Sequence, residues 1–233
     1  MKNLTQLYSK SIILLALISF SGLSSCKKTE TADQNIALIR VVNASPSSAT
    51  YNAYLNSIKI NTVALPFGGS AAYASNVAGS YNLKFTTESN VESLFTKQIT
   101  LDNKTYYSSY LINKPSGLDV YTITDDLSVP SADKAYVRFL NLSPDATAFD
   151  LIKTGATTAL FTNKTFKNAT GFVAVDAGTY SFDAKETSSD TVRTTTVSTT
   201  FAAGNHYDVL LGGLVTPAND TERPLSLQAI LIK

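Results

Sequence analysis

The chain repeats itself at an interval of about 100 residues. Three stretches return, with an offset that grows from 98 to 100: 39–52 as 137–150, 78–81 as 177–180, and 101–107 as 201–207. In the first pair, "IRVVNASPSSATYN" becomes "VRFLNLSPDATAFD". Single-residue insertions in loops produce such a drift, because strands tolerate a change of register poorly. A unit of this length is a whole domain rather than a solenoid repeat, so the sequence predicts two similar domains.

The segments between the turns have the pattern of β-strands. In "SYNLKF", Tyr81, Leu83 and Phe85 fall on one side of an extended chain. Short strands separated by turn-rich loops favour sandwiches or barrels. With 44% hydrophobic and 16% charged residues, the composition is that of a globular protein. We therefore expect an all-β protein of two tandem sandwiches, with the boundaries domain 1 at 36–127, linker at 128–134 and domain 2 at 135–233.

The residues that recur are mostly those that shape turns and strands. The repeated pairs are Arg40 and Arg138, Asn43 and Asn141, Pro46 and Pro144, Gly79 and Gly178, and Tyr81 and Tyr180. Proline presets φ for a turn, asparagine caps backbone amides, and glycine adopts positive φ at a strand start, so a folding role explains them. The arginines lie mid-strand between apolar neighbours. For them we expect an ion pair or a carbonyl contact rather than a ligand.

The first 26 residues differ in kind from the rest. A charged start, the apolar run "SIILLALISF" and the small residues that follow indicate an export signal. The run has about half of the roughly 20 residues that a membrane-spanning helix needs. The ending "LSSC" resembles the lipobox of bacterial lipoproteins, which implies that the chain is cut before Cys26 and that this cysteine carries acyl chains. We therefore expect a signal peptide at 1–25 and a lipidated cysteine with a flexible tether at 26–35.

The repeated motifs also resemble a known family. The V-R-x-x-N-x-S-P-D-A opening, the A-G-T-Y strand start and the tandem arrangement are similar to the domain of unknown function 4397 family, found in envelope lipoproteins of Bacteroidota and in other bacterial surface proteins. The resemblance covers roughly 36–233 in two copies, and the first copy has Ser47 where the pattern has aspartate. It implies an immunoglobulin-like or prealbumin-like sandwich, and it supplies no catalytic residues.

Residues suited to catalysis or to metal binding are scarce. The only histidine, His206, stands at a strand start where the first copy has Tyr106, and we expect a structural role for it. The only cysteine is the expected lipidation site, so the sequence predicts no disulfide, no cofactor and no His/Cys metal site. Three aspartates near the linker leave a calcium site open as an alternative: Asp125, Asp126 and Asp133. Acidic linkers are more often simply solvated.

The remaining candidates concern binding. If Tyr107, Ser109 and Leu111 face the core, then Tyr106 and Tyr110 face outward and can stack on a sugar ring. A net charge of +1 gives no reason to expect nucleic acid as a partner. We expect a non-enzymatic binding, adhesion or scaffold module, lipid-anchored in the cell envelope at the outer membrane, with a protein or glycan ligand. Two alternatives stay open: an envelope hydrolase that uses carboxylates or a serine in an inter-domain cleft, and a subunit of a larger surface assembly.

Overall fold

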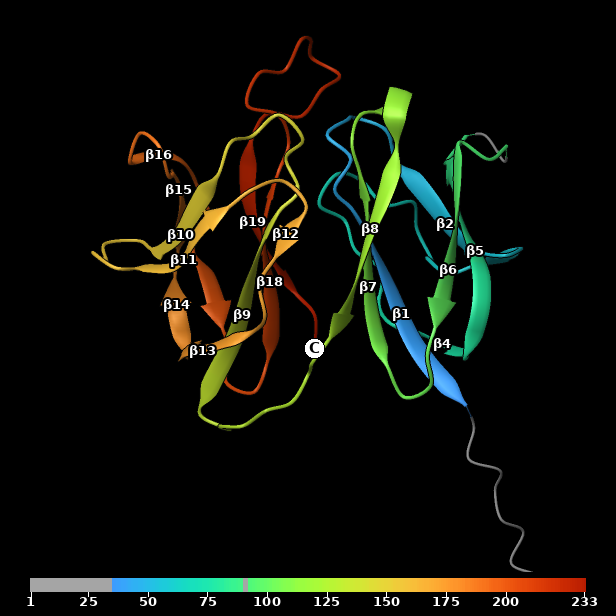
Figure 1. The fold of residues 1–233 in the computed structure, drawn as a ribbon, viewed down its shortest axis with the longest axis horizontal. Coiled ribbons are helices and arrows are strands. Elements are labelled where there is room, and N and C mark those ends of the chain that lie inside the picture. Colours follow the sequence, from blue (N-terminus) through green and yellow to red (C-terminus); the bar gives the residue numbers. More distant parts are fainter. Residues whose placement is uncertain (1–34, 90–91) are drawn as a thin grey trace, which may run out of the picture. The chain divides into compact units, whose positions relative to one another are not determined.

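The computed structural model describes residues 35–89 and 92–233, which form one compact unit of β-strands joined by loops (Figure 1). Within these residues the one helical segment is a 3-10 turn, η1 (Pro115–Gly117). The all-β prediction is therefore confirmed. No helix in the described part of the chain has the length and the apolar character that crossing a membrane requires. The expected signal peptide and Cys26 lie outside the described residues.

The first half, described from residue 35 to 89 and from 92 to 125, is a sandwich of two sheets. Its strands are β1 (Ile36–Asn43), β2 (Tyr51–Leu55), β3 (Ile58–Lys59), β4 (Ala74–Val77), β5 (Gly79–Thr87), β6 (Phe95–Leu101), β7 (Tyr106–Ile112) and β8 (Asp119–Asp125). One sheet has the order β4-β1-β7-β8 and the other β3-β2-β5-β6. All neighbours are antiparallel except β1 and β7, which run parallel at the centre of their sheet.

The second half repeats this arrangement. Its strands are β9 (Lys134–Asn141), β10 (Phe149–Lys153), β11 (Ala159–Lys164), β12 (Asn168–Ala169), β13 (Val173–Asp176), β14 (Gly178–Tyr180), β15 (Phe182–Glu186), β16 (Thr191–Thr195), β17 (Thr199–Phe201), β18 (His206–Gly212) and β19 (Ser226–Leu231). One sheet has the order β12-β9-β18-β19, with β13 also paired to β9. Opposite it lies β11-β10-β15-β16, and β14 pairs with β17. The parallel pair β9–β18 keeps the register of β1–β7, since Leu38 faces Tyr106 and Tyr136 faces His206.

This strand order distinguishes between the two sandwiches that the family resemblance implies. In the immunoglobulin order, one sheet holds the first, second, fifth and fourth strands, and the other holds the third, sixth and seventh. Here β1, the first strand, lies between β4 and β7, and β8 extends the sheet beyond β7. In the second half β9 likewise lies between β12 or β13 on one side and β18 on the other, and β19 extends the sheet beyond β18. The observed order therefore differs from the immunoglobulin one and favours the prealbumin-like alternative.

Three apolar cores hold the unit together. One lies inside each sandwich, with Phe85 and Phe139 among the fully buried side chains. The third lies between the halves, where Val42, Tyr110 and Leu140 contact across the β1–β7 and β9–β18 sheets. The central strands of these two sheets, β1, β7, β9 and β18, are consequently buried on both faces, which accounts for their mostly apolar residues. Because the two halves share this third core, the structure does not separate them into independent domains. The expected domain boundaries therefore stay a prediction.

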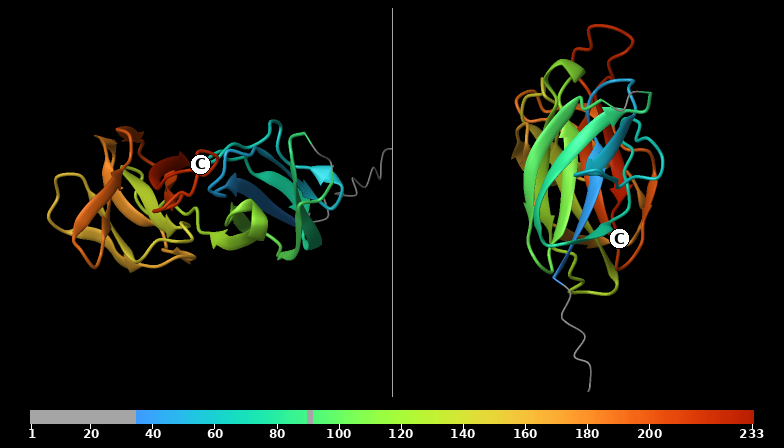
Figure 2. Two further views of the ribbon diagram at one scale, coloured as in Figure 1. Left: turned by 90° about the horizontal axis from the view of Figure 1, so that it is seen from above. Right: turned by 90° about the vertical axis from the view of Figure 1, so that its right-hand side faces the viewer.

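Four loops gather at the end of the unit opposite the start of β1 (Figures 1 and 2). They connect β1 to β2, β7 to β8, β9 to β10, and β18 to β19. The long β18–β19 loop reaches the first half: the amide of Ser48 donates to Thr221 O over 2.8 Å, and the amide of Arg223 donates to Pro46 O over 3.1 Å. An ion pair of 2.7 Å between Lys114 and Glu222 adds a further link.

Candidate functional site

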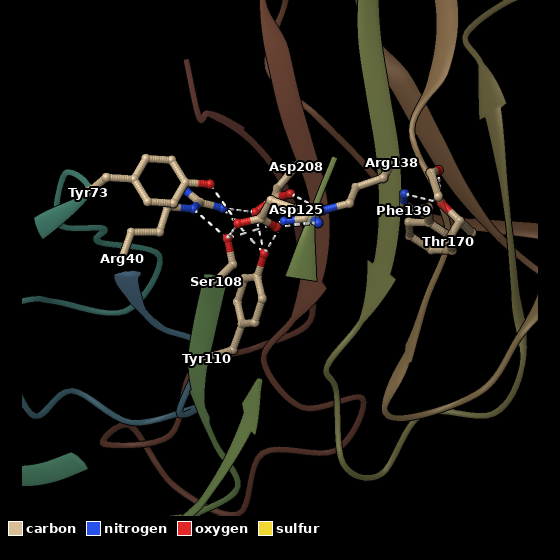
Figure 3. A network of polar contacts seen from close by, with 10 residues as sticks. Arg40, Tyr73, Ser108, Tyr110, Asp125, Arg138, Phe139, Thr170 and Asp208 are labelled. Atoms are coloured by element: carbon tan, nitrogen blue, oxygen red, sulfur yellow. Dashed lines mark hydrogen bonds and ion pairs between the residues drawn. The ribbon is translucent and has the colours of Figure 1, made fainter. Parts of the chain in front are cut away.

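The two repeated arginines meet at the contact between the halves. Arg40 lies on β1 and Arg138 at the equivalent position of β9, and each is 2% exposed. Their neighbours along each strand fill the sandwich core, so the arginines project from the opposite face, toward the other half (Figure 3). The duplication therefore places two guanidinium groups in one buried space, where they require counter-charges.

Asp208, on β18, supplies a counter-charge to both arginines. Its Oδ1 lies 2.6 Å from Arg138 Nε, and its Oδ2 forms an ion pair with Arg40 Nη2. The hydroxyl of Tyr110 donates to the same Oδ2 over 2.5 Å. Asp208 is fully buried, and burial alone raises the pKa of a carboxyl. The two guanidinium groups outweigh that effect and hold the pKa of Asp208 below its ordinary value.

Asp125, the last residue of β8, is the second counter-charge. Its Oδ1 lies 2.6 Å from Arg138 Nη1, and its Oδ2 accepts hydrogen bonds from Ser108 Oγ at 2.7 Å and from Tyr73 OH at 2.6 Å. Arg40 Nε in turn donates to Ser108 Oγ over 2.7 Å. Two cations and two carboxylates thus balance one another. We call the seven residues that these contacts connect the Arg–Asp network: Arg40, Tyr73, Ser108, Tyr110, Asp125, Arg138 and Asp208.

The network is asymmetric although the fold is duplicated. Ser108 and Asp208 occupy equivalent register positions, because Arg40 faces Ser108 and Arg138 faces Asp208 across the parallel pairs. At this register position the second copy therefore has a carboxylate where the first copy has a hydroxyl group. Sequence reasoning missed the role of Asp208, although a signal was present: Asp208 is the one acidic residue in the mostly apolar strand "HYDVLLG". Nothing in the sequence pattern pointed to Tyr73.

The expectation that Tyr110 faces outward to a ligand is wrong. Its ring does leave the sandwich core, as predicted from the inward positions of Tyr107 and Leu111. The outward face of β7 is covered by the second half, however, so Tyr110 is fully buried. Tyr106 is half-buried, with its ring edge-on to Tyr73 at 5.3 Å between centroids. The two tyrosines therefore do not form an exposed pair on which a sugar can stack.

The repeated turn residues have matching structural contacts. Asn43 Nδ2 donates to Leu65 O over 2.9 Å, and Asn141 Nδ2 donates to Lys164 O over 2.9 Å. Each asparagine also accepts a hydrogen bond from the amide two residues ahead, which is an Asx-turn. Pro46 and Pro144 follow within these turns. The sequence pairs thus shape the ends of β1 and β9.

The A-G-S/T-Y motif also repeats in detail. Gly79 has φ +155° and Gly178 has φ +151°, a backbone region that favours glycine. Two residues later, Tyr81 OH donates to Val77 O over 2.6 Å and Tyr180 OH donates to Asp176 O over 2.8 Å. Each tyrosine thereby fastens a strand start to the chain four residues earlier.

His206 is buried among aromatic rings. It stacks on Tyr136 at 4.9 Å and meets Phe172 edge-on at the same centroid distance. Its Nε2 donates to Ser128 O over 3.0 Å, which ties the linker to β18. Burial lowers the pKa of His206, so the ring is neutral near pH 7. These contacts are those of a packed side chain.

The three linker aspartates do not converge. Asp125 is in the Arg–Asp network, Asp126 accepts a hydrogen bond from the Ser128 amide, and Asp133 accepts one from Ser131 Oγ. Within residues 35–89 and 92–233, no group of three histidine, cysteine, aspartate or glutamate side chains is placed to hold a metal ion. The calcium alternative therefore has no support from the geometry.

Solved structures similar to this chain are remote. The chain is 10% identical to a family 26 carbohydrate-binding module from Eubacterium rectale in complex with maltoheptaose, with a TM-score of 0.24 over 81% of this chain and 100% of that one. It is 12% identical to a leucine-rich repeat protein from Bacteroides thetaiotaomicron, with a TM-score of 0.21 over 83% of this chain and 26% of that one. Scores this low carry no argument about fold or ligand.

The comparison by family is more specific. No curated protein matches the chain. Residues 37–152 match the model of a domain of unknown function, DUF4397, which confirms the resemblance for one copy. The matched segment contains the first half almost entirely, together with β9 and β10. The match over residues 37–152 therefore supports the DUF4397 domain family for this part of the chain.

Proposed function

We propose that this chain is a non-catalytic binding module of the bacterial cell envelope, anchored in the outer membrane by acyl chains on Cys26. The observation that carries the proposal is the gathering of four loops from both halves at one end, opposite the start of β1 (Figure 1). Loops held by a rigid scaffold are where binding residues are most often found. The flexible tether expected from the sequence has nine residues after Cys26, 27–35, and such a chain would have a relaxed reach of about 15–18 Å, which would leave this end available to a protein or glycan.

The Arg–Asp network supports a binding role over the hydrolase alternative. A carboxylate-based hydrolase needs its acidic groups accessible to substrate and to water. Asp125 and Asp208 do converge, but they are 7% and 0% exposed and each is ion-paired with arginine. The charges are therefore committed to joining the two halves.

Two of the edge strands, β6 and β16, give little support to the assembly alternative. A sheet edge that recruits another chain is long, flat and apolar. Edge strand β6 exposes Lys97 and Gln98, and edge strand β16 exposes Arg193. Charged residues of this kind oppose strand addition.

The anchor is tested by labelling. Wild-type protein and the Cys26→Ser variant are expressed in a bacterium with a lipoprotein pathway and a labelled fatty acid, and membranes are fractionated. We expect label in the wild-type outer membrane fraction, and an unlabelled, unprocessed or soluble Cys26→Ser product. Label retained by Cys26→Ser, or wild-type protein without label, contradicts the anchor.

The binding role is tested with the soluble chain 27–233 on glycan arrays and on intact envelope proteins. The matched variant replaces Pro217–Asp220, the tip of the β18–β19 loop, by a Gly-Ser linker of equal length. We expect a ligand that wild type retains and the loop variant loses at unchanged thermal stability. Turnover of a polysaccharide or peptide by wild type that Asp125→Asn abolishes would support the hydrolase instead.

A further inference from the structure

A cavity of about 350 Å³ opens in the second half, away from the loop end and from the Arg–Asp network. Its apolar walls come from both sheets: Leu160 on β11, Val175 on β13 and Phe182 on β15. All three side chains also contact the core of the second half. The volume lies within the range of sites for small ligands, and the walls provide an apolar surface on which such a ligand can pack.

Two lysines give the cavity a positive mouth. Lys134 pairs with Asp176, with 2.7 Å between Nζ and Oδ1. Lys153 Nζ lies 4.1 Å from the centroid of the Tyr180 ring, and among the described residues it forms no ion pair. The three ionised groups at the cavity therefore carry one positive charge in excess. The Lys153 ammonium also covers the ring face of Tyr180 on which a sugar would stack.

The duplicated first half provides an internal comparison. Lys153 faces Phe182 in the β10–β15 ladder, and in the same register of the β2–β5 ladder Leu55 faces Leu83. Leu55 is 1% exposed and belongs to the core of the first half, whereas Lys153 is exposed. The second copy thus has an ammonium group and an open cavity where the first copy has a packed leucine.

A second pair of facing residues, on the neighbouring strands, is also apolar in the first half and charged in the second. In the first half Ile36 faces Val77 across β1 and β4, and in the second half Lys134 faces Asp176 across β9 and β13. An apolar pair has become an ion pair at the rim of the cavity. These two differences accompany an amphipathic pocket in the second half, apolar inside and cationic at its mouth.

We propose that this cavity binds a small amphipathic monocarboxylate, with its aliphatic chain against Leu160, Val175 and Phe182 and its carboxylate paired with Lys153. Burial of the aliphatic chain supplies the non-specific part of the affinity. The charge-assisted contact with Lys153 selects an anion over a neutral or cationic head group. This site is independent of the lipid anchor and of the loop end, so it stands or fails separately from the proposed function.

Octanoate is the probe, titrated by calorimetry into the soluble chain 27–233. We expect one site with a dissociation constant below about 1 mM. Octan-1-ol tests whether the head group must be charged, and octylamine tests the sign of that charge. Both are expected to bind about twofold to fivefold more weakly than octanoate, because the contact with the exposed Lys153 is lost. Equal binding of octanoate and octylamine, or no binding of octanoate, overturns the proposal.

Variants locate the site. Lys153→Gln removes the cation, and we expect it to weaken octanoate binding by about twofold to fivefold and to leave octan-1-ol binding unchanged. Ala159→Leu enlarges a half-buried side chain in the lining, and we expect it to weaken both probes. Lys164→Gln, on the same strand as Ala159 but outside the lining, is the matched control and is expected to bind as wild type does. Thermal unfolding verifies that each variant is folded, and octanoate binding that neither Lys153→Gln nor Ala159→Leu weakens overturns the proposal.

Discussion

At the scale of single residues, the decisive feature is a shared carboxylate. The carboxylate of Asp208 neutralises the positive charges of both Arg40 and Arg138. The attraction of the two guanidinium groups in turn offsets the free-energy cost of burying this carboxylate. A buried ion pair is not in itself strong evidence of stability, since its Coulombic gain is set against the cost of removing charges from water. Removing one partner, however, leaves the others buried without compensation.

Asp208→Asn is therefore expected to destabilise the folded protein strongly, by about 3–5 kcal/mol. The substitution keeps the size of the side chain and removes its charge, so the two arginines retain only Asp125 as a counter-ion. Urea unfolding of the soluble chain measures the change. The control is Asp190→Asn, which removes an exposed carboxylate paired with Lys185 and should unfold as wild type does. A wild-type unfolding midpoint for Asp208→Asn would show that the network contributes little.

At the scale of elements, the strand starts at Gly79 and Gly178 are constrained by backbone conformation and not by space. No atom outside the neighbouring residues lies within 4 Å of the position that a Cβ would take at Gly79. The positive φ alone must therefore account for the glycine there.

Gly79→Ala is accordingly expected to cost about 1–3 kcal/mol through backbone strain. Gly117→Ala is the matched control, because its added methyl also meets nothing within 4 Å and its φ lies outside the positive range. The two variants are compared by thermal or urea unfolding. Equal stability of the two would mean that φ at residue 79 relaxes without cost.

The sequence predicted the strands and turns better than the contacts that these elements make with distant parts of the chain. Alternation in "SYNLKF" and the turn chemistry of Asn43 and Pro46 are local signals, and the strands and turns follow them. The covering of β7 by the second half is a long-range contact, and alternation cannot distinguish a solvent-facing side from one buried by another sheet. This is why Tyr110 was assigned to the surface. The cavity beside Lys153 was missed because it depends on which register position the lysine occupies, and that follows from strand pairing.

At the scale of the whole molecule, charged residues outside the network also join the halves. Asp119 on β8 accepts hydrogen bonds from Lys97 at 2.9 Å and from Lys167 at 2.8 Å, and Lys167 belongs to the second half. Burial raises the pKa of this carboxyl, but the two ammonium groups outweigh burial and lower it to about 2.

A carboxyl whose pKa is lower in the folded state stabilises that state above its unfolded pKa and loses this contribution as the pH falls through the folded value. For Asp119 the window runs from the ordinary value of 3.8 down to about 2. We therefore expect the free energy of unfolding to fall between pH 4 and pH 2, approximately, and to fall less steeply in Asp119→Asn. Urea unfolding at a series of pH values measures both slopes. If the free energy of unfolding fell equally steeply with pH in both proteins, Asp119 would not be a cause of the acid sensitivity.

The central claim is that two copies of one sandwich form a single body, joined by a shared apolar core and by the Arg–Asp network. Differential scanning calorimetry of the chain 27–233 at neutral pH tests it most directly. We expect one transition whose calorimetric enthalpy equals its van't Hoff enthalpy, because neither half can expose its inner sheet without exposing that of the other. Two separate transitions in the wild-type protein would contradict the claim and show that the halves unfold independently.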